Sequence, residues 1–281
     1  MAIEKPYWEE IENTLVEPLP KDSIADSNKV KDGEDVTITF AEEETQNLLK
    51  NVNHAYNTEI NDILLTALVK TVGDFTGRDK VLINLEGHGR ESIIEGLDIS
   101  RTIGWFTSTF PVVLETYKEK DISYRIKSVK ESIRRIPNKG IGYGLLKYLA
   151  SDENGTYSYK LAPQISFNYM GQFNQDGNMD GVSISKISSG DNFSLDSERL
   201  YDLDINGMIR EGKLMITINY NRGEYNLSTI SGIANSFRDN LHEIIEHCGY
   251  KKEAEITPHD LGTSDISLEE LDDILEAASL L

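Results

Sequence analysis

The stretch Asn84 to Glu91, "NLEGHGRE", holds a carboxylate, an imidazole and a guanidinium around two glycines. These groups belong to Glu86, His88 and Arg90, and they directly follow the apolar run "KVLI". A glutamate at a strand end, flanked by glycines that let a substrate approach, can act as a general acid and base once partial burial moves its pKa toward neutrality. A surface salt bridge between Glu86 and Arg90 explains the same letters, and a hydrogen-bonded structural role is the simpler interpretation of His88.

Other catalytic chemistries lack their sequence signatures. The 5 histidines are scattered without the HExxH spacing of a zinc helix, so we expect no metal site. The runs "EGHGRE" and "NKGIGYG" lack the Walker lysine followed by Ser or Thr, and no Gly-x-Ser-x-Gly elbow occurs. The single cysteine, Cys248, permits no internal disulfide, and we expect it to be buried near a helix end.

Composition and charge exclude several classes of partner. The chain has 281 residues and 38% hydrophobic content, enough for one large domain or two modest ones. Asp plus Glu number 48 against 28 Lys plus Arg, so the net charge of -20 repels nucleic acid and anionic membranes. No apolar run approaches the length of a membrane span, and "MAIEKPYWEE" lacks signal-peptide features, which predicts a cytoplasmic location.

The hydrophobic pattern predicts an α/β fold, a mixed sheet covered by helices rather than a parallel doubly wound sheet. Strands are expected in "DVTITF", "KVLINLEG", "PQISFNYMG" and the hairpin "LDINGMIREGKLMITINYN". The run "RTIGWFTSTFPVVLE" indicates a broken strand, because Gly104 and Pro111 interrupt it. Amphipathic helices are expected in "AEEETQNLLKNVNHAYN", "EINDILLTALVKTV", "DISYRIKSVKESIRRIP" and "LSTISGIANSFRDNLHEIIEHC".

The two ends of the chain differ from its body. Residues 1–35 are polar, contain scattered prolines and lack periodicity, so we expect a linker without a core element. Residues 36–250 carry the predicted sheet and helices. Residues 251–281 are expected to form a flexible linker and then a short acidic helix. The apolar face of that helix is expected to contain Leu268, Leu271, Ile274 and Leu275.

Six runs stand in the order, and close to the spacing, found in epimerization domains of nonribosomal peptide synthetases, which this chain resembles from about Tyr7 to Cys248. The runs are "TEINDILLTAL", "INLEGHGRE", "RTIGWFTSTFPVVLE", "RRIPNKGIGYGLLKYL", "ISFNYMGQF" and "YDLDINGMIREGKL". The resemblance implies the condensation-superfamily fold, in which two chloramphenicol-acetyltransferase-like halves meet in a V around the active site. The family's first half carries a His-His-x-x-x-Asp motif. This sequence has no His-His pair, so it resembles the C-terminal half alone.

The resemblance implies inversion from L to D at the α-carbon of an aminoacyl or peptidyl residue. The residue is held as a thioester on the phosphopantetheine of a peptidyl carrier protein. Glu86 would be the acid and base on one face and the absent histidine would serve the other, so we expect the isolated chain to be inactive. Asn168 and Tyr169 would position the thioester or an enolate-like intermediate. No cofactor bound by this chain is implied, because thioester α-protons are acidic enough for such a base.

Supporting residues also follow from the resemblance. His88 and Arg90 would hold the Glu86 loop, while Trp105 to Ser108 would line the tunnel and Tyr143 would support it. The tail "DISLEELDDILEAASLL" is similar to the acidic docking helix recognised by a following synthetase, which favours a basic acceptor. The anchors of that helix would be Leu271, Ile274 and Leu275. The implied partners are the carrier protein, the N-terminal half of the domain and the downstream synthetase.

Two other functions stay open at this point. The chain could be a docking or scaffold fragment in which the catalytic motifs persist only as fold elements. A condensation domain that forms peptide bonds is the weaker alternative, because the "EGHGRE" and "NYMGQ" runs mark the epimerizing branch.

Overall fold

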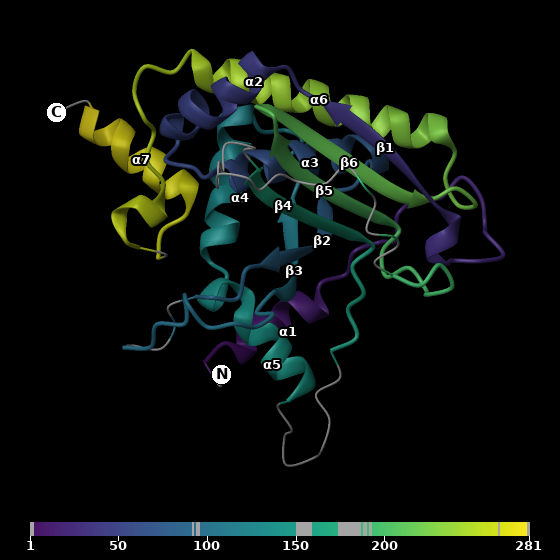
Figure 1. Cartoon of the computed structure of the whole chain (residues 1–281). Helices are drawn as coiled ribbons and strands as arrows, with labels where there is room; N and C mark the ends of the chain where they lie inside the picture. The colour runs from purple at the N-terminus through teal and green to yellow at the C-terminus, as the bar shows by residue number, and fades with distance from the viewer. Residues whose placement is uncertain are drawn as a thin grey trace, which may run out of the picture.

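The computed structural model describes residues 3–91, 93, 96–149, 159–173, 187, 190, 193–263 and 265–279 (Figure 1). Within these ranges one sheet has the strand order β1-β6-β5-β4-β2-β3. Strand β4 is parallel to both β2 and β5, and the other neighbours pair antiparallel. This confirms the predicted mixed sheet. The strands are β1 Gly33–Thr39, β2 Lys80–Gly87, β3 Ser108–Glu115, β4 Ile165–Phe173, β5 Leu203–Arg210 and β6 Lys213–Asn221.

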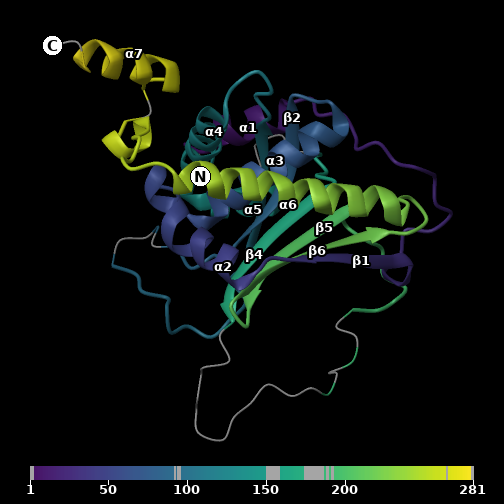
Figure 2. The ribbon, with the colours of Figure 1, turned by 90° about the horizontal axis from the view of Figure 1, so that it is seen from above.

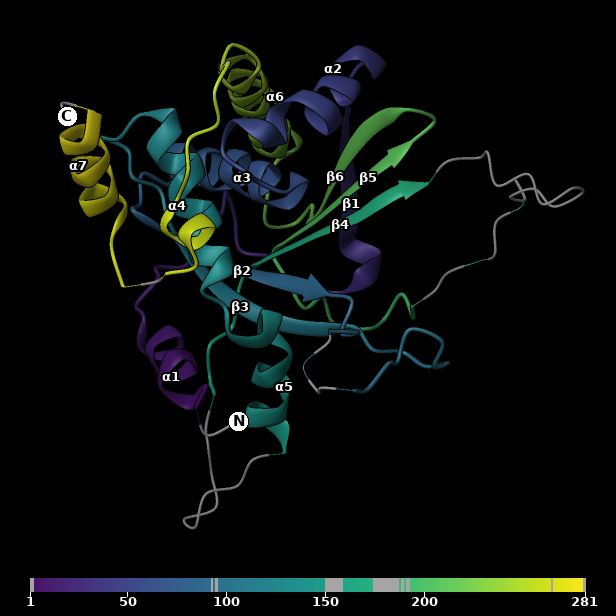
Figure 3. The same cartoon turned by 90° about the vertical axis from the view of Figure 1, so that its left-hand side faces the viewer.

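Helices cover one face of this sheet. Helix α6 packs on β1 and β6 and against α3, while α3 also contacts β2 (Figures 2 and 3). The helices are α1 Lys5–Asn13, α2 Glu42–Asn47, α3 Ile60–Thr76, α4 Ile122–Arg134, α5 Ile141–Tyr148, α6 Leu227–Gly249 and α7 Leu268–Ser279. Shorter helical turns are η1 Val30–Asp32, η2 Leu48–Val52, η3 Asn53–Ala55, η4 Pro137–Gly140 and η5 Pro258–Leu261.

The two faces of the sheet differ in polarity because side chains alternate along each strand. Ile38, Phe167, Ile205 and Ile218 point into the helix-covered core and are at most 4% exposed. Their neighbours on the opposite face are mostly Asp, Asn, Ser and Thr, and several of these are half-buried. The sheet therefore has one apolar face under the helices and one polar face.

Two local sequence predictions can be compared with strand geometry. Strands β5 and β6 form the predicted hairpin, whose turn residues Glu211 and Gly212 have φ of 53° and 74°. Such left-handed values match the turn that joins twisted antiparallel strands. The predicted break at Gly104 precedes β3, but Pro111 lies inside it. A proline is tolerated there because β3 is an edge strand.

The N-terminal region differs from the predicted linker because it contributes to the core. Helix α1 buries Trp8 completely, and the Trp8 ring lies 5.1 Å from the Tyr143 ring and 6.4 Å from the Phe110 ring. Its Nε1 donates to Glu4 Oε2 at 3.3 Å. The spacing of one tryptophan among charged residues gave no periodic signal, so the sequence did not predict this contact.

The C-terminal region is also packed more closely than a flexible linker. Thr257 is 0% exposed, and Lys130 donates to Asp260 Oδ2 at 2.7 Å. In α7, Leu271 is 2% exposed, while Ile274 and Leu275 are 55% and 42% exposed. Leu271 therefore packs inside this chain and is unsuited to the docking role predicted for it. Residues 280 and 281 of the predicted docking helix lie outside the described residues.

Two further sequence predictions concern burial and membranes. Cys248 is 0% exposed, which confirms its predicted burial, and that burial raises the pKa of its thiol to about 12. Among the helices that the structure describes, none combines the length and apolar character needed to span a bilayer.

The 2 tryptophans of the chain provide a test of the α1 packing. Trp8→Ala should lower the free energy of unfolding by about 3 to 5 kcal/mol, because it removes a fully buried ring. Trp105→Ala is the control, since Trp105 is 91% exposed and its loss should change stability by less than about 0.5 kcal/mol. Urea unfolding followed by circular dichroism measures both. Equal stability of the two variants would contradict the packing of α1.

Candidate active site

The site begins where the parallel strands β2 and β4 separate. They pair over three positions, ending at Leu85 opposite Phe167, and the next residues on the two strands are Glu86 and Asn168. Asn168 Nδ2 donates to Glu86 Oε2 at 2.8 Å across this gap. Figure 3 shows β2 turning away from β4 at this end. Polar groups at the carboxyl ends of separating parallel strands are the usual setting of a ligand crevice.

A cavity of about 800 Å³ opens at this separation. Its lining includes Glu86, His88, Asn168 and Tyr169 of the predicted site residues. Thr107, within the range Trp105 to Ser108 expected to line the tunnel, also lines the cavity. Residues not assigned to the site from the sequence complete it: Glu59, Asn61, Leu85, Gly87, Glu91, Phe110, Ile133, Arg134, Ile136, Lys139, Met170, Phe173 and His259. The volume lies within the usual range for small-molecule sites.

Two ionisable groups that line the cavity have raised pKa values. Partial burial raises the pKa of Glu86, and the carboxylate of Asp204 on β5 raises it further. Burial also raises the pKa of the Tyr169 hydroxyl, which keeps that group protonated as a hydrogen-bond donor. The arrangement suits proton transfer by Glu86 next to two neutral donors. Within the described residues, no group of three His, Cys, Asp or Glu side chains is placed to hold a metal ion.

Arg90 ties the end of β2 to the loop that precedes β3. Its guanidinium donates to Ile99 O at 2.6 Å and Gly104 O at 3.3 Å, and lies 4.1 Å above the Phe106 ring. His88 Nδ1 accepts from the Arg90 backbone N–H at 3.0 Å, and His88 Nε2 lies 3.0 Å from Glu91 Oε1. These contacts fit the supporting role predicted for both residues.

The chain also matches a model of a known protein family. The model described as "Condensation domain" matches residues 1–266. The chain belongs to the condensation-domain family.

Relatives of this condensation-domain chain include large synthases. Tyrocidine synthase 2 of Brevibacillus parabrevis is 46% identical over 272 residues, which is 96% of this chain and 8% of that protein. Gramicidin S synthase 1 of Brevibacillus brevis is 45% identical over 283 residues, covering 97% of this chain and 26% of that protein. The chain therefore spans only a small part of these synthases.

A solved structure matches the fold closely. The epimerization domain from the third module of tyrocidine synthetase B is 45% identical, with a TM-score of 0.83. The match covers 89% of this chain and 56% of that domain. This match supports the fold expected from the sequence, which is that of the chloramphenicol-acetyltransferase-like C-terminal half of such a domain.

Trp105, Ser108 and Tyr143, three further predicted site residues, are not among the residues that line this cavity. Trp105 is 91% exposed, because the loop folds against Arg90 through Phe106 and leaves Trp105 outside. Ser108 starts β3 opposite Gly87 and is half-buried. Tyr143 is 5% exposed and donates to Glu12 Oε1 at 2.9 Å, so it supports the packing of α1.

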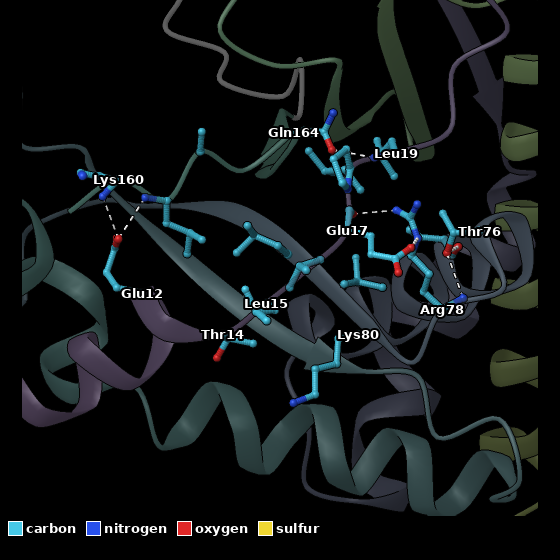
Figure 4. A pocket seen from close by; sticks show the side chains of 18 residues that line it. Glu12, Thr14, Leu15, Glu17, Leu19, Thr76, Arg78, Lys80, Lys160 and Gln164 are labelled. Atoms are coloured by element: carbon cyan, nitrogen blue, oxygen red, sulfur yellow. Dashed lines mark hydrogen bonds and ion pairs between the residues drawn. The ribbon is translucent and has the colours of Figure 1, made fainter. Parts of the chain in front are cut away.

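A second cavity, of about 420 Å³, lies at the opposite ends of β2 and β4 (Figure 4). The end of α1 and the segment that follows it run along this cavity and are fixed at three points. Glu12 accepts from the Lys160 N–H at 2.8 Å, Arg78 donates to Glu17 O at 2.6 Å, and the Leu19 N–H donates to Gln164 Oε1 at 2.6 Å. This cavity contains none of the predicted site residues, so we place the chemistry at the larger one.

Substitution of Gly89 tests how tightly the loop that precedes β3, residues 99–107, is held in place. Its φ is +65°, and a Cβ at this position would lie 1.6 Å from Phe106 O. Gly89→Ala should therefore displace the loop and increase amide hydrogen exchange in residues 99–107, because the Arg90 contacts are lost.

The matched control is Gly96→Ala. Gly96 has φ of +78°, but a Cβ there meets nothing within 4 Å. This variant shares the backbone strain without the clash, and it should leave exchange in residues 99–107 near the native rate. Similar exchange in both variants would show that the Phe106 contact does not fix the loop.

Proposed function

We propose that this chain forms the C-terminal half of an epimerization domain of a nonribosomal peptide synthetase. In this proposal Glu86 moves a proton at the α-carbon of an aminoacyl or peptidyl thioester. The observation that carries the proposal is the Asn168 to Glu86 hydrogen bond of 2.8 Å in a cavity where burial raises the pKa of Glu86. The similarity to the tyrocidine epimerization domain supports it.

The proposed reaction is a pair of proton transfers. The Glu86 carboxylate takes the α-proton, and the electrons of the broken C–H bond move into an enolate stabilised at the thioester oxygen. The acid on the second face then donates a proton to the opposite side of the α-carbon, and the protonated Glu86 gives the proton it took to solvent, which regenerates its carboxylate. A carboxyl whose pKa is raised toward working pH can serve in both directions of such a reaction.

Asn168 and Tyr169 take different parts in this proposal. Asn168 Nδ2 already donates to Glu86, so it fixes the carboxylate relative to the substrate. The Tyr169 side chain lines the same cavity and keeps its proton, so it can donate to the developing enolate oxygen. Both residues lie on β4 just beyond its last pair with β2. The pairing of β4 with β5 continues at these positions and holds their backbone in place.

The proposed partners follow from this reaction. A peptidyl carrier protein would deliver the substrate on its phosphopantetheine arm. The N-terminal half of the domain would supply the group on the second face of the α-carbon. The chain alone is then expected to lack epimerase activity, while retaining the half-site around Glu86.

Solvent exchange of the substrate α-deuterium tests the role of Glu86. The chain together with a separately produced N-terminal half should catalyse this exchange, and Glu86→Gln should slow it by at least about 100-fold. The control is Glu115→Gln, since Glu115 lies at the far end of the β2–β3 pair, opposite Lys80. Exchange by the chain alone, or full exchange with Glu86→Gln, would contradict the proposal.

We also propose that α7 binds a downstream synthetase. Lys127 on α4 lies 3.2 Å from Asp272, and the Tyr124 hydroxyl donates to Glu269 at 2.8 Å. Together with buried Leu271, these contacts hold one face of α7 on the body of the chain. Ile274 and Leu275 on the same helix are exposed among acidic residues, which favours a partner with an apolar groove and basic rim.

Ile274→Asp tests this second role. It should weaken binding to the downstream synthetase by roughly tenfold or more without lowering stability, because Ile274 is 55% exposed. Leu261→Asp serves as control, since Leu261 on η5 is 54% exposed but lies outside α7. Isothermal titration with the partner's N-terminal region measures both. Unchanged affinity of the Ile274 variant would remove this residue from the interface.

A further inference from the structure

The polar face of the sheet carries two rows of side chains that cross five strands in register. The first row contains Asn84, Ser166, Asp204, Asn219 and Asp35. In the second row the paired positions are Asn168, Asn206, Thr217 and Thr37, and Glu86 joins it through its hydrogen bond to Asn168. The rows are two residues apart along each strand, so Glu86 and Asp204 lie on the same face.

Asp204 is held firmly in its row. Asn206 Nδ2 donates to Asp204 Oδ1 at 3.2 Å, and the Ser166 side chain on the neighbouring strand also hydrogen-bonds to the Asp204 carboxylate. Burial raises the pKa of Asp204, whereas the positive charge of Arg199 lowers it. Ser166 is itself buried. The carboxylate therefore has a fixed position in partly desolvated surroundings, where its charge acts over a longer range than in water.

Arg199, whose charge acts on Asp204, is hydrogen-bonded to another member of the same row. Arg199 Nη1 donates to the Asn219 side chain, and Nη2 donates to Asn219 O at 3.3 Å. Asn219 in turn donates to Asp35 Oδ1 at 2.6 Å. Arg199 thus lies on the side of Asp204 toward β6 and β1, while Glu86 lies on the side toward β4 and β2.

We propose that Asp204 is a positioning residue that controls the protonation of Glu86 across the sheet. Asn206 fixes the Asp204 carboxylate and Asn168 fixes the Glu86 carboxylate, so the distance between the two charges is set by the strand register. This inference rests on the proposed function of Glu86. A base that must also return a proton is helped by a fixed negative charge that makes the protonated form accessible.

Other charged and titratable groups surround Glu86, and two of its cationic neighbours have carboxylate partners of their own. Arg134 is paired with Asp62 at 2.8 Å, and Lys139 with Glu91 at 3.1 Å. The groups lining the same cavity or lying beside the polar rows are Glu59, His88, Glu91, Arg134, Lys139, Tyr169, Arg199, Tyr201 and His259. Of the charged neighbours, Asp204 is the one whose charge raises the pKa of Glu86.

Carbon-13 NMR of the chain with labelled glutamate side chains tests the proposal without any activity assay. The Glu86 signal is assigned by its loss in Glu86→Gln, and its titration is followed from low to high pH. In Asp204→Asn the Glu86 midpoint should move to lower pH, because a neutral amide no longer opposes ionisation of the nearby carboxyl. The amide keeps an oxygen that can accept from Asn206.

Asp35→Asn is the matched control. It removes the same charge from the same polar row, at its far end on β1, and should leave the Glu86 midpoint unchanged. An unchanged midpoint in Asp204→Asn would overturn the proposal, as would an equal shift in Asp35→Asn, which would indicate a general effect of net charge. If Asp204→Asn does not give a native-like amide spectrum, Asp204→Ser provides the same loss of charge with a smaller side chain.

The outcome separates this inference from the proposed function. A lowered midpoint in Asp204→Asn supports the coupling even if Glu86→Gln keeps α-proton exchange in the complete domain, a result that would refute only the catalytic role. An unmoved midpoint refutes the coupling even if Glu86→Gln abolishes exchange.

Discussion

The separation of β2 from β4 is the constraint on which the site depends. Two parallel strands pair over three positions and then part, so the backbone at Glu86 and Asn168 no longer bonds directly across the gap. The Asn168 side chain bridges that gap to Glu86, and the cavity occupies the space that opens. On one side of the gap β3 pairs with β2, and on the other side β5 and β6 extend the sheet beyond β4. The residues of the candidate site therefore come from strands that are adjacent in space but distant in sequence.

Buried and partly buried charges organise the helices around this sheet. Lys130 is 1% exposed and donates to both Tyr56 O and Asp260, while Lys127 is 5% exposed and faces Asp272 and Glu255. A buried ammonium is costly unless its donors are satisfied, so α4 can be placed only where these acceptors converge. The C-terminal segment supplies most of them. The acidic tail is thus part of the folded body through these contacts, and the outer side of α7 is exposed to solvent.

Local patterns predicted much of the fold, because alternation and helical spacing are properties of neighbouring residues. The β5–β6 hairpin, the α3 and α6 helices and the buried Cys248 follow from such patterns. Glu86 was recognisable from its glycine-flanked setting, and the resemblance to a family added Asn168. The burial of Trp8 and Leu271 was not predictable in this way, since each depends on contacts with elements that are distant in sequence. Asp204 lies in the run "YDLDINGMIREGKL", but its placement on the same face of the sheet as Glu86 could be found only from the strand order.

The burial of Cys248 has a practical consequence for studying this chain. Thiol-directed dyes and spin labels react with the thiolate, and a fully enclosed thiol with a pKa of about 12 offers almost none at neutral pH. A cysteine introduced on an exposed surface would therefore be modified selectively in the native background. Pairs of such cysteines, one on the body and one on the outer side of α7, would allow distance measurements by fluorescence or electron paramagnetic resonance without first removing the natural residue.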